Sequence, residues 1–220
     1  MSPYLTPSRP FPLDWLKRAR DQRSVKTNPA TWTKYPTMSS LALPVAINRD
    51  ELVADCRRIG DFKDDDALRL LFVKTMMWGS GTTNGRGPRY TDQALSQGGT
   101  LEVLRRVRHQ LDDGDIAAAY YAHREIRGIG PSFHTKWLWV VGTAAGTAPQ
   151  PLILDLNVWN ALAELDWNSE TEASTRRWGR RYIAYLQACH AWAEQVTKAS
   201  GAIYSAQDIE YSLFVRGQSG

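Results

Sequence analysis

The sequence predicts a mainly α-helical protein, and three observations support that prediction. Apolar residues recur at helical spacing along much of the chain, as in the run from Leu68 to Met76. Residues that cap helices well stand before several of these runs. No alternating apolar and polar pattern persists long enough to indicate a large sheet. With 220 residues, 43% of them hydrophobic, the chain can build a core as one large unit or as two closely packed lobes.

The elements expected along the chain begin with an N-terminal arm. Residues 1–45 are rich in Pro, Thr and Ser, which indicates an extended arm with one short helix near 13–21. Residues 46–220 form the helical unit, with a glycine-rich loop at 79–90 and a turn at 113–114. Its expected helices are one capped by Asn48, one that starts at Asp64–Asp66, and others at 100–111, 115–125, 157–165, 174–198 and 205–215.

A segment almost without charge stands out in the middle of the chain. In the 27 residues between Arg127 and Asp155, the only formal charge is Lys136. Burying an ammonium or a carboxylate without a partner is costly, so each of these two groups must be paired, neutralised or used. This pattern indicates an active site built on a lysine and an aspartate.

The same segment opens with a glycine turn between two helical patterns. Gly128-Ile129-Gly130 lets the backbone turn tightly while Ile129 fills the angle between the helices. Pro131 suits the first position of the second helix, where its missing N–H costs least. The free amides of such a helix start form an anion site that suits a DNA phosphate. An ordinary corner between two helices is the alternative for the glycines alone.

Charge and cysteine content limit the class of protein. The net charge of +4 is modest, but basic residues cluster at 17–23, at 105–108 and in RRWGRR at 176–181. Such clusters fit a phosphate-binding surface, although arginines on ordinary helix exteriors are an equal alternative. Cys56 and Cys189 are far apart, which argues for a reducing cytoplasm and against a disulfide scaffold, an iron–sulfur cluster or a cysteine-rich zinc site. No membrane span and no secretory signal is expected.

The residues IRGIGPSFHTKW, followed by LILDLNVW, resemble the helix-hairpin-helix superfamily of DNA glycosylases, and within it the 8-oxoguanine glycosylase branch. The resemblance covers about 60–165 and is specific over 126–159. It implies a two-lobed helical fold with the active-site cleft between the lobes. The hairpin would occupy about 115–142, and the N- and C-terminal helices would pack together as one lobe. The chain lacks the cysteine cluster of the endonuclease III branch.

The resemblance also assigns roles to the lysine and the aspartate. In that family a lysine on the second hairpin helix attacks the sugar, and an aspartate in a V-D-x-x-V-like segment ends the following loop. Asp155 matches the aspartate position. The eukaryotic enzymes carry their lysine where this chain has Ser132, so Lys136 lies about one helical turn later. The archaeal enzymes are more similar, because a phenylalanine precedes their lysine as Phe133 precedes Lys136.

The chemistry of base excision suits these two residue types. Cleaving the N-glycosidic bond of a flipped nucleotide builds positive charge at C1′, which a carboxylate stabilises. A lysine removed from water can act as the neutral amine that attacks C1′ and forms a Schiff base. The structural alternatives are a snorkelling lysine at Lys136 and a simple helix cap at Asp155, and capping is compatible with catalysis.

Further candidates surround this pair. Gly128, Gly130 and Ser132 are expected to contact the DNA backbone. Asn84, Arg86, Arg89 and Tyr90 of the glycine-rich loop could fill the gap left by a flipped base or contact phosphate, or they belong to a plain solvent loop. His134, Trp78 and Trp159 are candidates for the base pocket, with core packing or a structural histidine as the alternative.

The sequence therefore predicts a cytoplasmic, nucleoid-associated DNA glycosylase that acts as a monomer on double-stranded DNA containing a modified base. The resemblance implies no organic cofactor and no site metal, apart from a monovalent cation in the hairpin. The excised base is either 8-oxoguanine or a bulky modified base of phage DNA, such as glucosylated hydroxymethylcytosine, removed in antiviral defence. The alternative from another class is a helix-hairpin-helix protein that only grips DNA.

Overall fold

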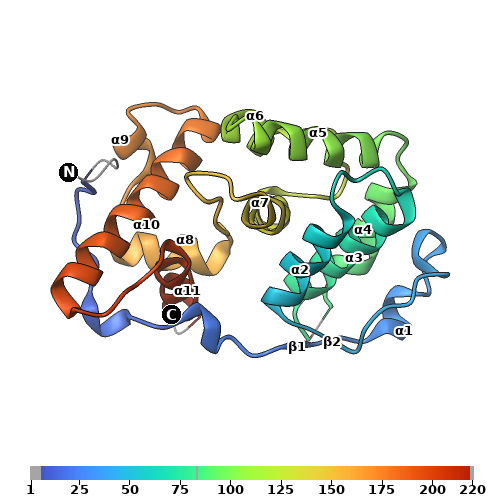
Figure 1. Cartoon of the computed structure of the whole chain (residues 1–220), viewed down its shortest axis with the longest axis horizontal. Coiled ribbons are helices and arrows are strands. Elements are labelled where there is room, and N and C mark those ends of the chain that lie inside the picture. The colour runs from blue at the N-terminus through green and yellow to red at the C-terminus, as the bar shows by residue number, and fades with distance from the viewer. Residues whose placement is uncertain (1–5, 83, 219–220) are drawn as a thin grey trace. The chain divides into compact units, whose positions relative to one another are not determined.

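The computed structural model describes residues 6–82 and 84–218, and it confirms the predicted mainly α architecture. Contacts between residues divide the chain into two compact units (Figure 1). The central unit comprises Gln22–Thr147, and the terminal unit comprises Met1–Asp21 together with Ala148–Gly220. No helix in the described part of the chain is long and apolar enough to cross a membrane.

The central unit is built around one buried helix. Helix α7 contacts α2, α3, α5 and α6, and Trp137 on α7 packs in the core against Phe62 and Phe72. The elements of this unit are β1 (Val25–Lys26), α1 (Pro29–Trp32), a 3₁₀ turn (Pro36–Met38), β2 (Ala46–Ile47), α2 (Arg49–Ile59), α3 (Asp65–Ser80), α4 (Gly87–Ser96), α5 (Thr100–Asp112), α6 (Ile116–Tyr121), a 3₁₀ turn (Ala122–Glu125) and α7 (Pro131–Ala145). The two short strands pair antiparallel, with Val25 opposite Ile47.

The terminal unit packs three helices against the start of the chain. Helix α11 contacts both α8 and α10, and at their crossing a side chain added at Gly217 would meet the Asn157 carbonyl oxygen at 1.8 Å. The N-terminal segment is fastened to these helices, because Ser212 Oγ accepts from the Lys17 amide at 2.8 Å and Trp192 Nε1 donates to the Arg9 carbonyl at 2.7 Å. The elements are 3₁₀ turns at Leu13–Trp15 and Ala19–Asp21, α8 (Leu156–Glu164), α9 (Ser169–Ala173), α10 (Trp178–Ser200) and α11 (Ala206–Gly217).

The predicted helix starts are confirmed where a capping side chain marks them. Asn48 and Glu51 form a reciprocal capping box at α2, and Ser205 and Asp208 form another at α11. Asp64 caps α3, and α7 begins at Pro131 as expected. These starts follow from short polar side chains that satisfy the first free amides of each helix.

Several predicted boundaries are wrong. The loop expected at 79–90 is shorter, since α3 continues to Ser80 and α4 starts at Gly87, with Pro88 suited to its first turn. Thr100 does not cap α5, because its hydroxyl donates to the Ala94 carbonyl at 2.5 Å. The helix expected to start at Ser174 begins at Trp178, after Ser174 adopts a left-handed conformation with φ of 48°. The helix expected at 115–125 becomes a 3₁₀ turn after Tyr121.

The segment predicted as the N-terminal arm contributes residues to both units. Residues up to Asp21 belong to the terminal unit, whereas residues from Gln22 onward belong to the central unit. The short helix expected near 13–21 is replaced by the two 3₁₀ turns of that range. The domain boundary expected at residue 45 stays a prediction.

Candidate active site

The hairpin turn lies in the central unit between Glu125 and Pro131. Gly128 has a φ of +78°, and a Cβ there would stand 2.9 Å from the carbonyl oxygen of Tyr90, so both backbone conformation and space require glycine. Ile129 is buried and fills the corner as predicted. Gly130 differs, because its φ is −82° and a Cβ would meet nothing within 4 Å. Nothing within the described chain requires glycine at Gly130, whose surroundings are open.

Gln97 holds the hairpin in shape, and sequence reasoning missed it. Its side-chain amide donates to the Glu125 carbonyl at 2.5 Å and accepts from the Arg127 amide at 2.8 Å. One side chain from the end of α4 therefore satisfies two backbone groups of the turn. A lone glutamine after a helix carries no sequence signal for this role, since the partners are 28 and 30 residues away.

The start of α7 is free of a side-chain cap. Gly130 is the N-cap residue and has no side chain to offer, and the amides of Phe133 and His134 bond to the Gly130 carbonyl. The earliest amides of a helix have no partner within it, and the helix dipole favours an anion there. Ser132 is half-buried in this first turn, and its contact with the DNA backbone stays a prediction.

Lys136 is enclosed on α7 in the central unit. Its side chain is 7% exposed, its Nζ donates to the Ser132 carbonyl at 3.4 Å, and Nζ lies 5.6 Å from the centroid of the Phe133 ring. A snorkelling lysine would carry its ammonium out to water, so this burial disfavours that alternative. The amine is therefore close to the start of the hairpin helix, within one turn of the anion-binding amides.

Gly79 makes the space in which the lysine lies. A Cβ added at Gly79 on α3 would stand 2.6 Å from Cδ of Lys136, 3.2 Å from its Cε and 3.3 Å from the Phe133 ring. Gly79 sits inside a helix, where glycine costs about 1 kcal/mol relative to alanine. The sequence predicted a loop at Gly79, although this glycine directly follows a strong helical pattern.

Asp155 is held in the terminal unit by hydrogen bonds. It is 8% exposed and caps α8, because its Oδ1 accepts from the Val158 amide at 3.2 Å. The strand-like segment before it is fixed by two buried tyrosines of α10. Tyr182 donates to the Leu152 carbonyl and Tyr185 donates to the Ile153 carbonyl, each at 2.7 Å. The capping interpretation of Asp155 is thus confirmed, and its carboxylate is placed on a rigid support.

Tyr185, Cys189 and Glu210 form a buried polar cluster next to this segment. Burial raises the pKa of Tyr185 well above its ordinary value, and the nearby Cys189 and Glu210 add to that effect. Burial likewise raises the pKa of the Cys189 thiol, which is consequently inert as a nucleophile. The tyrosine hydroxyl remains a neutral donor and stays bonded to the segment that leads to Asp155.

His134 lies inside the hairpin. Its Nε2 bonds to the Ala119 carbonyl at 2.7 Å, its ring contacts that of His123, and burial lowers its pKa to about 4. The imidazole is therefore neutral and donates its proton to α6. This position ties the two hairpin helices together and matches the structural alternative more closely than a base pocket.

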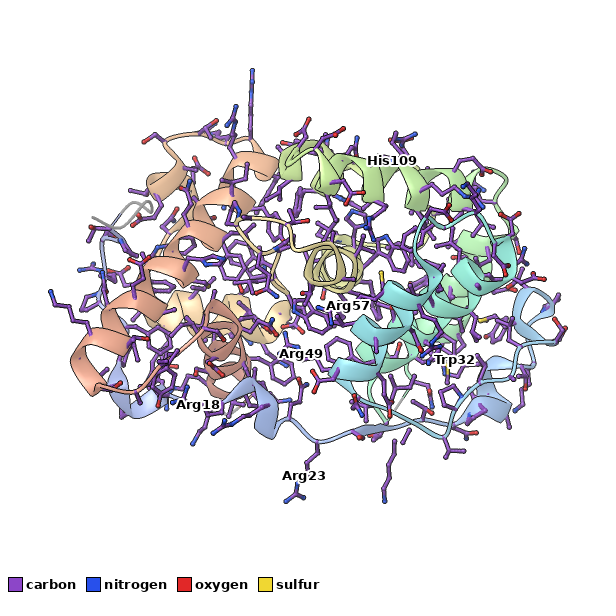
Figure 2. All side chains as sticks on the ribbon, viewed as in Figure 1. Arg18, Arg23, Trp32, Arg49, Arg57 and His109 are labelled. Atoms are coloured by element: carbon purple, nitrogen blue, oxygen red, sulfur yellow. The ribbon has the colours of Figure 1, made fainter. Side chains whose placement is uncertain are left out.

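Trp137 and Trp139 lie on the lysine helix, and Trp78 of α3 contacts that helix. Trp78 stacks on Trp139 with ring centroids 5.8 Å apart, and the guanidinium of Arg49, at the start of α2 (Figure 2), lies 4.3 Å from the Trp139 ring centroid. The indole N–H groups of Trp78, Trp137 and Trp139 are buried without a partner among the described residues. Trp78 directly precedes Gly79, which leaves room for the lysine, and its contact with a flipped base stays a prediction.

The loop after α3 contributes exposed arginines and a buried asparagine. Asn84 adopts a left-handed conformation with φ of 55°, and its Oδ1 accepts from Trp32 Nε1 at 2.7 Å. Because this asparagine anchors the loop on the core, it is not free to fill a gap in DNA. Arg86 and Arg89 are exposed, at the start and in the first turn of α4.

Trp159 lies one turn after Asp155 on α8, in the terminal unit. It is half-buried and makes an edge contact with Trp178, with ring centroids 6.0 Å apart. The structure thus brings Lys136, Phe133, Gly79 and Trp78 together in one unit, and it brings Asp155 and Trp159 together in the other. The predicted pairing of Lys136 with Asp155 joins the two units and stays a prediction.

Metal ligands are scarce around these residues. No group of three or more His, Cys, Asp or Glu side chains gathers as a metal site within residues 6–82 and 84–218. The monovalent cation expected in the hairpin would bind backbone carbonyls and stays a prediction.

A comparison with family models now identifies the chain. The model described as "Putative 8-oxoguanine DNA glycosylase OGG-like protein" matches residues 18–214, which is 197 of the 220 residues. The chain belongs to this OGG-like family. No curated protein and no solved structure matches it. The family match extends over both units, well beyond the motif region at 126–159, so the terminal unit is as much a part of the OGG-like chain as the hairpin.

Proposed function

We propose that this OGG-like protein is a DNA glycosylase that excises a modified base from double-stranded DNA, with Lys136 as the nucleophile and Asp155 as the electrostatic aid. The observation that carries the proposal is the enclosed amine of Lys136, for which Gly79 leaves room on the neighbouring helix. The amine lies one turn into the second hairpin helix, close to the uncapped start of that helix, where a DNA phosphate would bind.

The reaction follows from the two groups. The Lys136 nitrogen, as the free amine, forms a bond to C1′ while the C1′–base bond breaks and its electron pair leaves on the base nitrogen, which takes up a proton. The nitrogen then loses a proton, and its lone pair forms a double bond to C1′ as the C1′–O4′ bond breaks. The ring oxygen leaves with that bond's electron pair and takes up a proton, which opens the sugar and gives a Schiff base. Asp155 stabilises the positive charge that develops on the sugar. A Schiff base permits strand cleavage by elimination, which is the lyase activity of a bifunctional enzyme.

The hairpin supplies the grip on DNA in this proposal. The open surface at Gly130 allows a phosphate to approach the uncapped start of α7, and Ser132 stands in the same turn. Arg86 and Arg89 are exposed at the start and in the first turn of α4. They are suited to contact phosphates or to fill the gap in the opposite strand. Trp78 and Trp159 are the aromatic residues proposed to contact the flipped base.

The substrate is tested by base release from duplexes that carry 8-oxoguanine, uracil or glucosylated hydroxymethylcytosine. The family description favours 8-oxoguanine, whereas release of the glucosylated base alone would assign the enzyme to defence against modified phage DNA. Tight binding to all three duplexes without release from any would support a protein that only grips DNA.

The nucleophile is tested with borohydride, which reduces a Schiff base to a stable adduct. Wild-type protein should be trapped on its substrate, and Lys136→Gln should abolish trapping while DNA binding stays within a few-fold of wild type. Lys63→Gln is the matched control, because Lys63 is a surface lysine whose side chain is 86% exposed. If Lys136→Gln releases base at the full rate, Asp155 activates water and the enzyme has no lysine nucleophile.

A further inference from the structure

A second surface of the terminal unit carries exposed aromatic and basic side chains together. Trp178 is 41% exposed, the one aromatic residue among the exposed large hydrophobic side chains that the structure describes. Leu156, directly after Asp155, is 71% exposed. Leu156 and Trp159 are three residues apart on α8 and so share a helix face. Since Trp159 contacts Trp178, an apolar stripe leads from Asp155 toward the start of α10.

Basic residues lie next to Trp178 in the sequence. Arg177 and Arg180 are exposed and form no ion pair with a described residue. Arg181 places its guanidinium 3.7 Å from the centroid of the Trp178 ring. The nearby carboxylates are already engaged, since Glu170 pairs with Arg176 and Arg181, and Asp166 pairs with Arg9. The two free arginines therefore give the surface an uncompensated positive charge.

A small pocket opens in the same surface. It has a volume of about 230 Å³ and is lined by aromatic and polar side chains that include Trp159, Trp167, Asn168 and Arg181. Trp167 is 3% exposed, and its indole N–H has no hydrogen-bond partner among the described residues. A buried donor without a partner is costly and is expected to be satisfied by a ligand or water.

We propose that the tryptophan–arginine face, made of Leu156, Trp159, Arg177, Trp178 and Arg180, binds an unpaired stretch of DNA strand. An exposed tryptophan stacks on any base, and arginines beside it hold the phosphates, which together form the usual platform for single-stranded nucleic acid. Duplex DNA hides the faces of its bases and would use only the arginines. Because the stripe begins next to Asp155, the bound strand is the one that flanks the flipped nucleotide. This placement rests on the proposed function, whereas binding of single strands by the face does not.

The experiment measures binding of the full chain to a fluorescein-labelled oligothymidylate, and to the same strand in a duplex, by anisotropy at several salt concentrations. Trp178→Ala should weaken binding to the single strand about tenfold, with Trp178→Phe close to wild type, because stacking is lost only in the first. Duplex binding should change little. Replacing Arg177 and Arg180 together by Gln should lower the slope of log affinity against log salt by about 0.7 per arginine.

The matched control is the double replacement of Lys26 and Lys34 by Gln in the central unit. Both residues are exposed and lie outside the three basic clusters of the chain. This pair should leave single-strand affinity unchanged. Equal loss in Trp178→Ala and the control pair, or a loss confined to duplex, would overturn the proposal. If the protein binds single strands through Trp178 but releases no base, this face is supported and the proposed function is rejected. If the protein releases base but does not bind single strands through Trp178, the proposed function is supported and this face is rejected.

Discussion

Lys136 and Asp155 are held in place by opposite means. The lysine lies in a space shaped by packing, between the Phe133 ring and the bare backbone of Gly79. The aspartate is fixed by hydrogen bonds, through its own cap on α8 and through two tyrosines that bond the preceding carbonyls. A site shaped by packing is sensitive to added volume, whereas a site built from hydrogen bonds is sensitive to a lost polar group. The predictions below test this difference.

The largest effect is expected where charge changes without a change of shape. Asp155→Asn keeps a competent cap, since Asn and Asp cap helices about equally well, but it removes the negative charge that stabilises the sugar cation. We expect a melting temperature near that of wild type and a loss of base excision of about a hundredfold or more. Thermal melting and single-turnover base release measure the two quantities. A variant that melts early yet keeps its turnover when folded would reduce Asp155 to a structural cap.

At Lys136, added volume should lower the rate at which the covalent adduct forms. Gly79→Ala places a methyl group 2.6 Å from Cδ of Lys136, so the amine must shift. We expect trapping by borohydride to slow by about tenfold, because small misplacements of reacting groups are costly. Stability should fall slightly, because overpacking costs about 1–3 kcal/mol and the better helix propensity of alanine offsets about 1 kcal/mol of that cost.

Gly98→Ala serves as the control for this change, because a Cβ at Gly98 would meet nothing within 4 Å. Equal trapping rates in the two alanine variants and wild type would mean that the space beside Gly79 does not position the lysine.

His134 bonds the lysine helix to α6, and the pH dependence of stability should reveal this contact. His134 has a pKa of about 4 in the folded chain, below its ordinary value of 6.5. The unfolded chain therefore binds a proton first as the pH falls. The free energy of unfolding is therefore highest above about pH 6.5 and decreases toward pH 4, by an amount on the order of 3 kcal/mol. His134→Gln keeps a donor for the Ala119 carbonyl and should flatten this part of the stability profile. Urea denaturation across that pH range measures it, and an unchanged profile would exclude His134 as the source.

Sequence patterns predicted what short-range chemistry determines. The caps at Asn48, Asp64 and Asp155 are local, because each side chain bonds an amide two or three residues ahead. The hairpin glycines and the start of α7 at Pro131 were found for the same reason.

What escaped the sequence depends on partners far along the chain. Gly79 leaves room for a lysine 57 residues later. Gln97 bonds backbone groups 28 and 30 residues away. The two tyrosines of α10 donate to carbonyls 30 and 32 residues before them. The loop predicted at 79–90 was too long because glycine was interpreted as a loop former rather than as space for another side chain. The contact between Trp159 on α8 and Trp178 on α10 joins residues 19 positions apart in the sequence.

The most direct test of the account is to locate the residue that carries the trapped sugar. Wild-type protein is reduced with borohydride on its substrate duplex, digested with proteases, and the modified peptide is sequenced by mass spectrometry. The account predicts that the adduct lies on Lys136, in the peptide that includes Phe133 and Trp137. An adduct on another lysine or on the N-terminal amine, with Lys136 unmodified, would contradict the central claim.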